Sequence, residues 1–96
     1  MMRKNFGPKP WLYPMPVLII GTYDEAGVPD AMAAAWGMIS DWDKVTVCLG
    51  SDHKTVKNLR VKKAFTVSMA TAKNVVEADY VGIVSGNDVP DKVEKT

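Results

Sequence analysis

The residues best suited to chemistry form the segment Gly50-Ser51-Asp52-His53-Lys54-Thr55, which joins a predicted strand to a predicted helix. The first amides of a helix lack intrahelical partners and lie at its positive end, so they favour an anion such as phosphate. Lys54 adds a positive charge, and the polar side chains of Ser51, His53 and Thr55 add hydrogen-bond donors. Asn58 follows one turn after Lys54 and reaches the same side of the helix. The spacing is not that of a GxxxxGK phosphate loop.

A second interpretation of this segment involves no ligand. Ser51 or Asp52 caps the helix in that interpretation, and the lysines and arginine that follow form a solvated face. Spacing alone leaves both interpretations open.

A run of small residues precedes this segment and lies on one face of a predicted strand, namely Ala31, Ala33, Ala35 and Gly37. Small side chains allow a flat ring, or another piece of backbone, to approach a sheet closely. Trp36 is either a platform for such a ring or a core residue. The pattern therefore fits a planar ligand, but on its own it favours close packing of a helix or sheet.

The sequence predicts no catalytic side chain and no metal site. His53 has no carboxylate or nucleophile in register with it, and Cys48 lies inside a predicted strand, where a thiol usually packs inertly. One cysteine and one histidine exclude a zinc site of ordinary spacing. The GxGxxG, HExxH and EF-hand motifs are absent.

Hydrophobic periodicity predicts the elements that position these residues. We expect an extended proline-rich arm over residues 1–16, with Trp11 and Tyr13 packed on the domain, and a turn at residues 24–27. The pattern predicts strands at residues 17–23, 31–39, 44–49 and 64–70 and a helix at 54–63. A second helix, capped by Asn74 and stopped at Gly86, precedes a short helix that opens at Pro90. The prediction is a mainly β, α+β fold with unpaired edges that favour a partner.

Composition places the chain among ordinary globular domains. It has 96 residues, 47% hydrophobic and 24% charged, with a net charge of +1. This balance gives no reason to expect a nucleic-acid or membrane partner. No apolar run approaches the roughly 20 residues of a membrane span or the pattern of a signal peptide. We therefore expect one cytoplasmic domain over residues 1–96.

Several stretches together resemble the amino-terminal half of the flavin reductase-like, FMN-binding split-barrel family, and its flavoredoxin branch in particular. The matching stretches are Lys9-Pro10-Trp11-Leu12-Tyr13-Pro14, Val17-Leu18-Ile19-Ile20-Gly21-Thr22-Tyr23-Asp24, Ala34-Ala35-Trp36-Gly37, Val47-Cys48-Leu49, His53-Lys54-Thr55-Val56-Lys57-Asn58, Ala64-Phe65-Thr66-Val67-Ser68-Met69-Ala70-Thr71 and Asp79-Tyr80-Val81-Gly82. The resemblance covers nearly the whole chain. It implies a partial, antiparallel split β-barrel.

The resemblance also implies that FMN binds without a covalent link at the interface of a homodimer. The flavin-binding residues that it implies are Ala33, Ala34, Ala35, Trp36, Cys48, Leu49, Gly50, Ser51, His53, Lys54, Thr55, Asn58, Ala70 and Thr71. The implied activity is NAD(P)H-linked electron transfer through the flavin to a second flavin or another acceptor, with no side-chain acid or base.

Two departures from the family pattern keep other functions open. The chain ends where relatives continue into the rest of the barrel, and Asp30 and Ala33 stand near positions where relatives often carry asparagine. The alternatives are a non-catalytic FMN-binding or structural module left by truncation, and a relative that binds another phosphorylated ring such as a pyridoxine phosphate.

Overall fold

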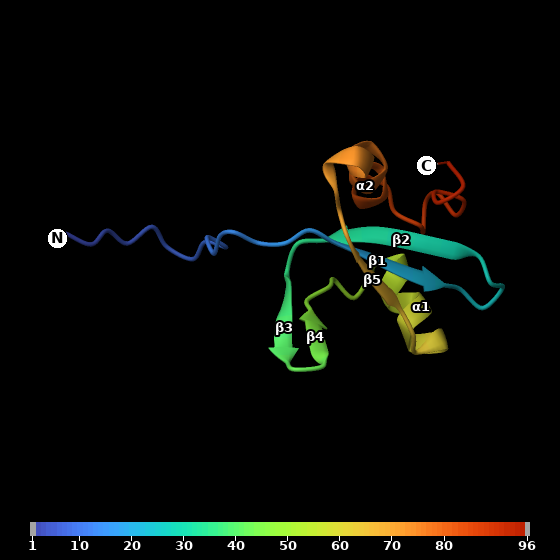
Figure 1. The fold of residues 1–96 in the computed structure, drawn as a ribbon, viewed down its shortest axis with the longest axis horizontal. Coiled ribbons are helices and arrows are strands. Elements are labelled where there is room, and N and C mark those ends of the chain that lie inside the picture. Colours follow the sequence, from blue (N-terminus) through green and yellow to red (C-terminus); the bar gives the residue numbers. More distant parts are fainter. Residues whose placement is uncertain (1, 96) are drawn as a thin grey trace.

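The computed structural model describes residues 2–95 and shows an open, mostly antiparallel β structure with helices on both faces of its main sheet (Figure 1). Met1 and Thr96, which belong to the predicted domain, lie outside the described residues. Within residues 2–95 the elements are β1 (Leu18–Tyr23), β2 (Pro29–Ala34), β3 (Gly37–Asp41), β4 (Lys44–Val47), α1 (Lys54–Lys62), β5 (Thr66–Met69), the 3-10 helix η1 (Ala72–Asn74) and α2 (Val75–Ile83). The predicted fold class, a mainly β chain with helical insertions, is confirmed.

Strand β1 is the centre of a three-stranded antiparallel sheet in the order β2-β1-β5. Its alternating side chains explain this position, because Leu18, Ile20 and Thr22 are buried on one face. Ile20 is fully buried, and with Leu18 and Ala34 it forms the hydrophobic core. The predicted strand at residues 17–23 therefore forms the middle of the fold.

The turn between β1 and β2 follows the predicted chemistry. The carboxylate of Asp24 accepts hydrogen bonds from the backbone N–H groups of Ala26 and Val28, both at 2.9 Å. Gly27 has φ +80°, a conformation that side chains disfavour. Local interactions alone thus define this hairpin.

The predicted strand at residues 31–39 is wrong as a single element, because the chain changes sheets in its middle. β2 ends at Ala34 and pairs with β1, whereas β3 begins at Gly37 and pairs with β4 in a separate two-stranded sheet. At the crossing, a Cβ on Gly37 would lie 2.6 Å from Cδ1 of Leu18. The close passage of the chain over the core explains the glycine and interrupts the strand.

Helices α1 and α2 cover opposite faces of the three-stranded sheet (Figure 1). α1 attaches through polar side chains, since buried Asn58 donates from Nδ2 to Oγ1 of Thr22 at 3.0 Å. α2 packs closely on β2, where a Cβ on Gly82 would lie 2.9 Å from Cβ of Ala33. Close helix packing, one of the two interpretations of the small residues, therefore applies to Ala33.

The predicted helix boundaries and caps need three corrections. The N-cap of α1 is His53, in an extended conformation without a side-chain cap hydrogen bond, so Ser51 and Asp52 do not cap it. Asn74 is the N-cap residue of α2, as predicted, but its side chain makes no cap hydrogen bond to α2 and instead accepts from the backbone N–H and hydroxyl of Thr71. The residues after Pro90 form turns and not a helix within the described part of the chain.

The amino-terminal arm extends away from the sheets (Figure 1), and residues 2–17 contain no helix or strand. Trp11 contacts Phe6 within the arm, with ring centroids 5.2 Å apart. Trp11 and Tyr13 stay 58% and 71% exposed, so the expected burial of these two rings on the domain is not observed. Neither helix in the described part of the chain has the length and apolar character needed to cross a lipid bilayer.

Candidate functional site

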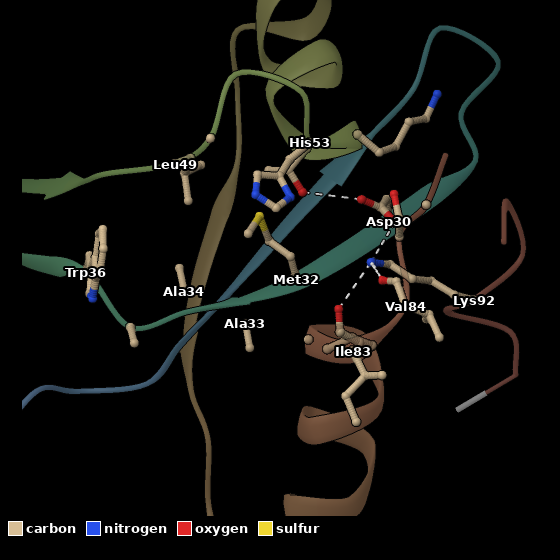
Figure 2. Close-up of a pocket in the computed structure, with 18 of the residues that line it drawn as sticks. Asp30, Met32, Ala33, Ala34, Trp36, Leu49, His53, Ile83, Val84 and Lys92 are labelled. Carbon is tan, nitrogen blue, oxygen red and sulfur yellow. Dashed lines mark hydrogen bonds and ion pairs between the residues drawn. The ribbon is translucent and has the colours of Figure 1, made fainter. Parts of the chain in front are cut away.

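A cavity of about 390 Å³ runs along the edge strand β2 (Figure 2). The loop from β4 into α1 forms one wall, and the end of α2 with the turn after it forms the other. Figure 2 shows Trp36 and Leu49 at one end, and His53, Asp30 and Lys92 toward the other. The cavity therefore has an apolar end and a polar end.

Most of the predicted site residues line this cavity. They are Ala33, Ala34, Ala35, Trp36, Cys48, Leu49, Gly50, His53, Lys54 and Thr55. Two of the small residues, Ala33 and Ala35, thus line the same cavity as the start of α1, whereas Ala31 and Gly37 line separate pockets.

The other four predicted residues lie outside the cavity. Ser51 is exposed in the turn before α1. Asn58 is buried and bonded to Thr22, and Ala70 lines a separate pocket between β5 and α2. Thr71 donates its backbone N–H to the side chain of Asn74 at 3.0 Å. Asn58 and Thr71 therefore already have structural partners within the chain.

The start of α1 supplies the positive character of the polar end. The first turn of the helix contains no acidic side chain of its own, and Lys54 is its first residue. The amides of this turn point out of the helix, as they do at any helix start. An anion of suitable size would find both a positive dipole end and a positive side chain here.

The apolar end is built at the break between β2 and β3. The carbonyl of Trp36 accepts a hydrogen bond from the backbone N–H of Cys48 at 2.8 Å, which ties the break to the strand leading into α1. The Trp36 side chain remains 55% exposed, and Met32 and Leu49 are partly buried against the core. This end offers a flat apolar wall that is open on one side.

Sequence reasoning missed the ion pair at the polar end. Nζ of Lys92 lies 3.5 Å from Oδ1 of Asp30, with both side chains almost fully buried, and it donates to the carbonyls of Val81 at 3.1 Å and Val84 at 2.9 Å. The proximity of Asp30 could be inferred from the sequence, but Lys92 stands in a polar tail with no local signal. The segment from Val81 to Gly86 also lines the cavity, although the sequence predicted it only as the end of a helix.

The arrangement suits binding more than acid–base chemistry. Within residues 2–95, no cluster of His, Cys, Asp or Glu side chains is able to hold a metal ion. Asp30, the buried carboxylate of the cavity, is engaged by Lys92 and by the hydroxyl of Thr55 at 3.3 Å. The cavity thus combines a basic helix start at one end with an apolar wall at the other.

Comparison with known proteins agrees with this geometry. Residues 11–95 match the model of the flavin reductase like domain. No curated protein sequence matches the chain significantly.

Among solved structures, flavoredoxin of Desulfovibrio vulgaris (Miyazaki F) is similar with a TM-score of 0.89 and 35% identity, over 98% of this chain and 52% of that one. A flavoredoxin from Methanosarcina acetivorans gives 0.82 and 25%, over 91% and 47% of the two chains. An FMN-binding domain of a flavin reductases-like enzyme from Shewanella baltica OS155 gives 0.77 and 26%, over 83% and 42%. The chain thus spans about half the length of these relatives. On the extent of the domain match, this chain belongs to the flavin reductase-like domain family.

Proposed function

We propose that the cavity along β2 binds FMN, with the phosphate at the start of α1 and the ring system beside Ala34, Ala35 and Trp36. The observation that carries this proposal is the meeting of a small, apolar wall and a basic helix start in one cavity of about 390 Å³. One of the similar structures is described as an FMN-binding domain, which supports the choice of FMN over another phosphorylated ring.

The residues present fit this cofactor at both ends. Lys54, the first residue of α1, supplies a charge for the phosphate. Thr55 supplies the backbone amide of the second helical position, since its hydroxyl is donated to Asp30. Ala35 is exposed and leaves room for a planar ring close to the backbone, whereas Ala33 packs against α2 and Ala34 belongs to the core. Trp36 offers an exposed aromatic face. The backbone of Cys48, Leu49 and Gly50 lines the same cavity and is available to the ring.

The proposed activity is NAD(P)H-linked electron transfer to a second flavin or another acceptor. The flavin, when bound, supplies the hydride and electron chemistry, and this chain positions it. No side chain of the cavity is assigned as a catalytic acid or base, because Asp30 is paired and His53 has no carboxylate partner within residues 2–95.

We further propose that the protein acts as a homodimer. Trp36, Met38 and Ile39 are exposed by 55%, 67% and 75%. An apolar groove of about 640 Å³ lies between the arm and this region. A second copy that covers the region would also close the open side of the cavity.

The decisive experiment is a visible absorption spectrum of the purified protein, loaded with FMN and separated from excess on a sizing column. A flavin band that travels with a dimer-sized peak is expected. Loss of all flavin from a folded protein would refute the proposed binding.

Turnover is then tested by NAD(P)H oxidation with added flavin or another acceptor. Retained flavin without turnover would favour the alternative of a non-catalytic FMN-binding module. The exposed apolar side chains of Trp36, Met38 and Ile39 are consistent with this non-catalytic module as well, because a partner chain could cover them.

A further inference from the structure

The polar end of the cavity contains a buried ion pair that the proposed function does not use. The side chains of Asp30 and Lys92 are 5% and 3% exposed, and Oδ1 of Asp30 is 3.5 Å from Nζ of Lys92. The same Asp30 oxygen is fully buried and accepts no hydrogen bond. A buried charge pair with an unsatisfied oxygen is costly to form, which calls for an explanation.

The Asp30 carboxylate lies beside the helix start that is proposed to hold the phosphate. Its Oδ2 accepts from the hydroxyl of Thr55, the second residue of α1, at 3.3 Å. A Cβ on Gly86 would lie 2.5 Å from Oδ1 of Asp30 and 2.9 Å from Cγ of Lys54. Asp30 and the stem of Lys54 therefore meet at the same point, next to the first turn of α1.

A carboxylate in this position opposes an anionic ligand. The carbonyls of Val81 and Val84 at the end of α2 add partial negative charge to the same region. Lys92 contacts all three groups, because its ammonium lies against Asp30 and donates to both carbonyls. One side chain thus compensates the negative charge that surrounds this end of the cavity.

We propose that the Asp30–Lys92 pair sets how strongly the cavity holds the phosphate of its ligand. Lys92 is a positioning and charge-compensating residue that cancels Asp30, so that Lys54 and the α1 amides determine the local field. This inference rests on the proposed binding of FMN. It goes beyond that function because it assigns the preference for a ligand with a phosphate to the Asp30–Lys92 pair, which lies outside the start of α1.

The test compares FMN with riboflavin, which has the same ring but no phosphate. The discrimination ratio, Kd of riboflavin divided by Kd of FMN, is measured for wild type, Asp30→Asn, Lys92→Met and the double variant. Unit charges several Å apart in a partly buried site give an effect of about fivefold or more. The ratio is expected to rise in Asp30→Asn, to fall in Lys92→Met, and to stay near wild type in the double variant.

The matched control is the exposed pair of Asp91 and Lys95, whose charged atoms are 3.6 Å apart and whose side chains are about half exposed. Asp91→Asn and Lys95→Met make the same two changes of side chain at exposed positions and are expected to leave the ratio unchanged. A ratio that stays constant in folded Asp30→Asn, or that moves equally in Asp91→Asn, would overturn the inference.

A second measurement covers variants that lose stability and separates this inference from the proposed function. Inorganic phosphate should raise the unfolding temperature of Asp30→Asn more than that of Asp91→Asn. The shift in Asp91→Asn measures the general salt effect of phosphate on stability. If Asp30→Asn is unfolded in buffer, phosphate should restore its fold. Equal shifts, or no refolding, refute the charge proposal. Absence of both flavins from folded wild type refutes the FMN proposal alone.

Discussion

The two ends of the cavity differ in how far contacts within this chain bury and pair their side chains. At the polar end, Asp30, Thr55 and Lys92 are all buried and engage one another or nearby carbonyls. At the other end, Trp36 is 55% exposed, and the β3–β4 hairpin that follows it, outside the cavity, leaves large apolar side chains in solvent, with Trp42 fully exposed. The polar end is built from contacts within the chain, whereas the hairpin end presents the surface that a partner would cover. Variants at each end should therefore disturb different properties.

The largest effect on stability is expected from Lys92→Met. Removal of one member of a buried pair leaves the Asp30 charge uncompensated, which typically costs about 3–5 kcal/mol of unfolding free energy. Urea denaturation followed by circular dichroism measures this loss. Lys95→Met, in the exposed pair, should change stability by less than about 1 kcal/mol. Similar losses in the two variants would contradict the difference between buried and exposed pairs.

Lys54→Ala should weaken FMN binding without unfolding the protein. Loss of a charge-assisted hydrogen bond costs about 1.5–3 kcal/mol, and the Kd should rise about 10- to 150-fold. Titration calorimetry measures the change, and Lys62→Ala at the far end of α1 is the control. An unchanged affinity would exclude Lys54 from the phosphate site.

Asn58→Ala tests whether this predicted site residue is structural. Its side chain bonds to the buried hydroxyl of Thr22, so the variant should lose about 1–3 kcal/mol of stability. FMN affinity of the folded variant should stay within about twofold, which is well below one tenfold step of 1.4 kcal/mol. A selective loss of affinity at full stability would return Asn58 to the binding site.

The smallest effect on stability is expected at the hairpin end. Ile39→Thr and Trp42→Ser alter exposed side chains and should change the unfolding free energy of the monomer by less than about 0.5 kcal/mol. Sedimentation equilibrium should instead show weaker self-association. A dimer of undiminished affinity in both variants would show that a second copy does not cover this hairpin.

Sequence patterns predicted those parts of the fold that depend on residues close together in the chain. The turn at Asp24–Gly27, the alternation of β1 and the helix after Gly50 all follow from local chemistry. The division of residues 31–39 between two sheets does not, because it depends on where Leu18 packs against the passing chain.

The candidate site shows the same division. Ala33, Ala35, Trp36 and the start of α1 were singled out by their types and spacing, and all of them line the cavity. Lys92 was missed because its partners, Asp30 and the carbonyls of Val81 and Val84, come from two other elements. Asn58 contacts Thr22 and does not line the cavity, because a residue one helical turn after Lys54 can face the sheet as readily as a ligand.

The position of Lys92 along the chain has a consequence for synthesis on the ribosome. β1, β2 and α1 are all made before the residue that compensates Asp30, which follows α2. A nascent chain that has formed the first hairpin still carries this carboxylate without its lysine partner, next to the proposed phosphate site. Contacts between distant segments form late in folding. Cofactor capture would therefore be delayed until the carboxyl-terminal turns have docked, so that premature intermediates stay empty.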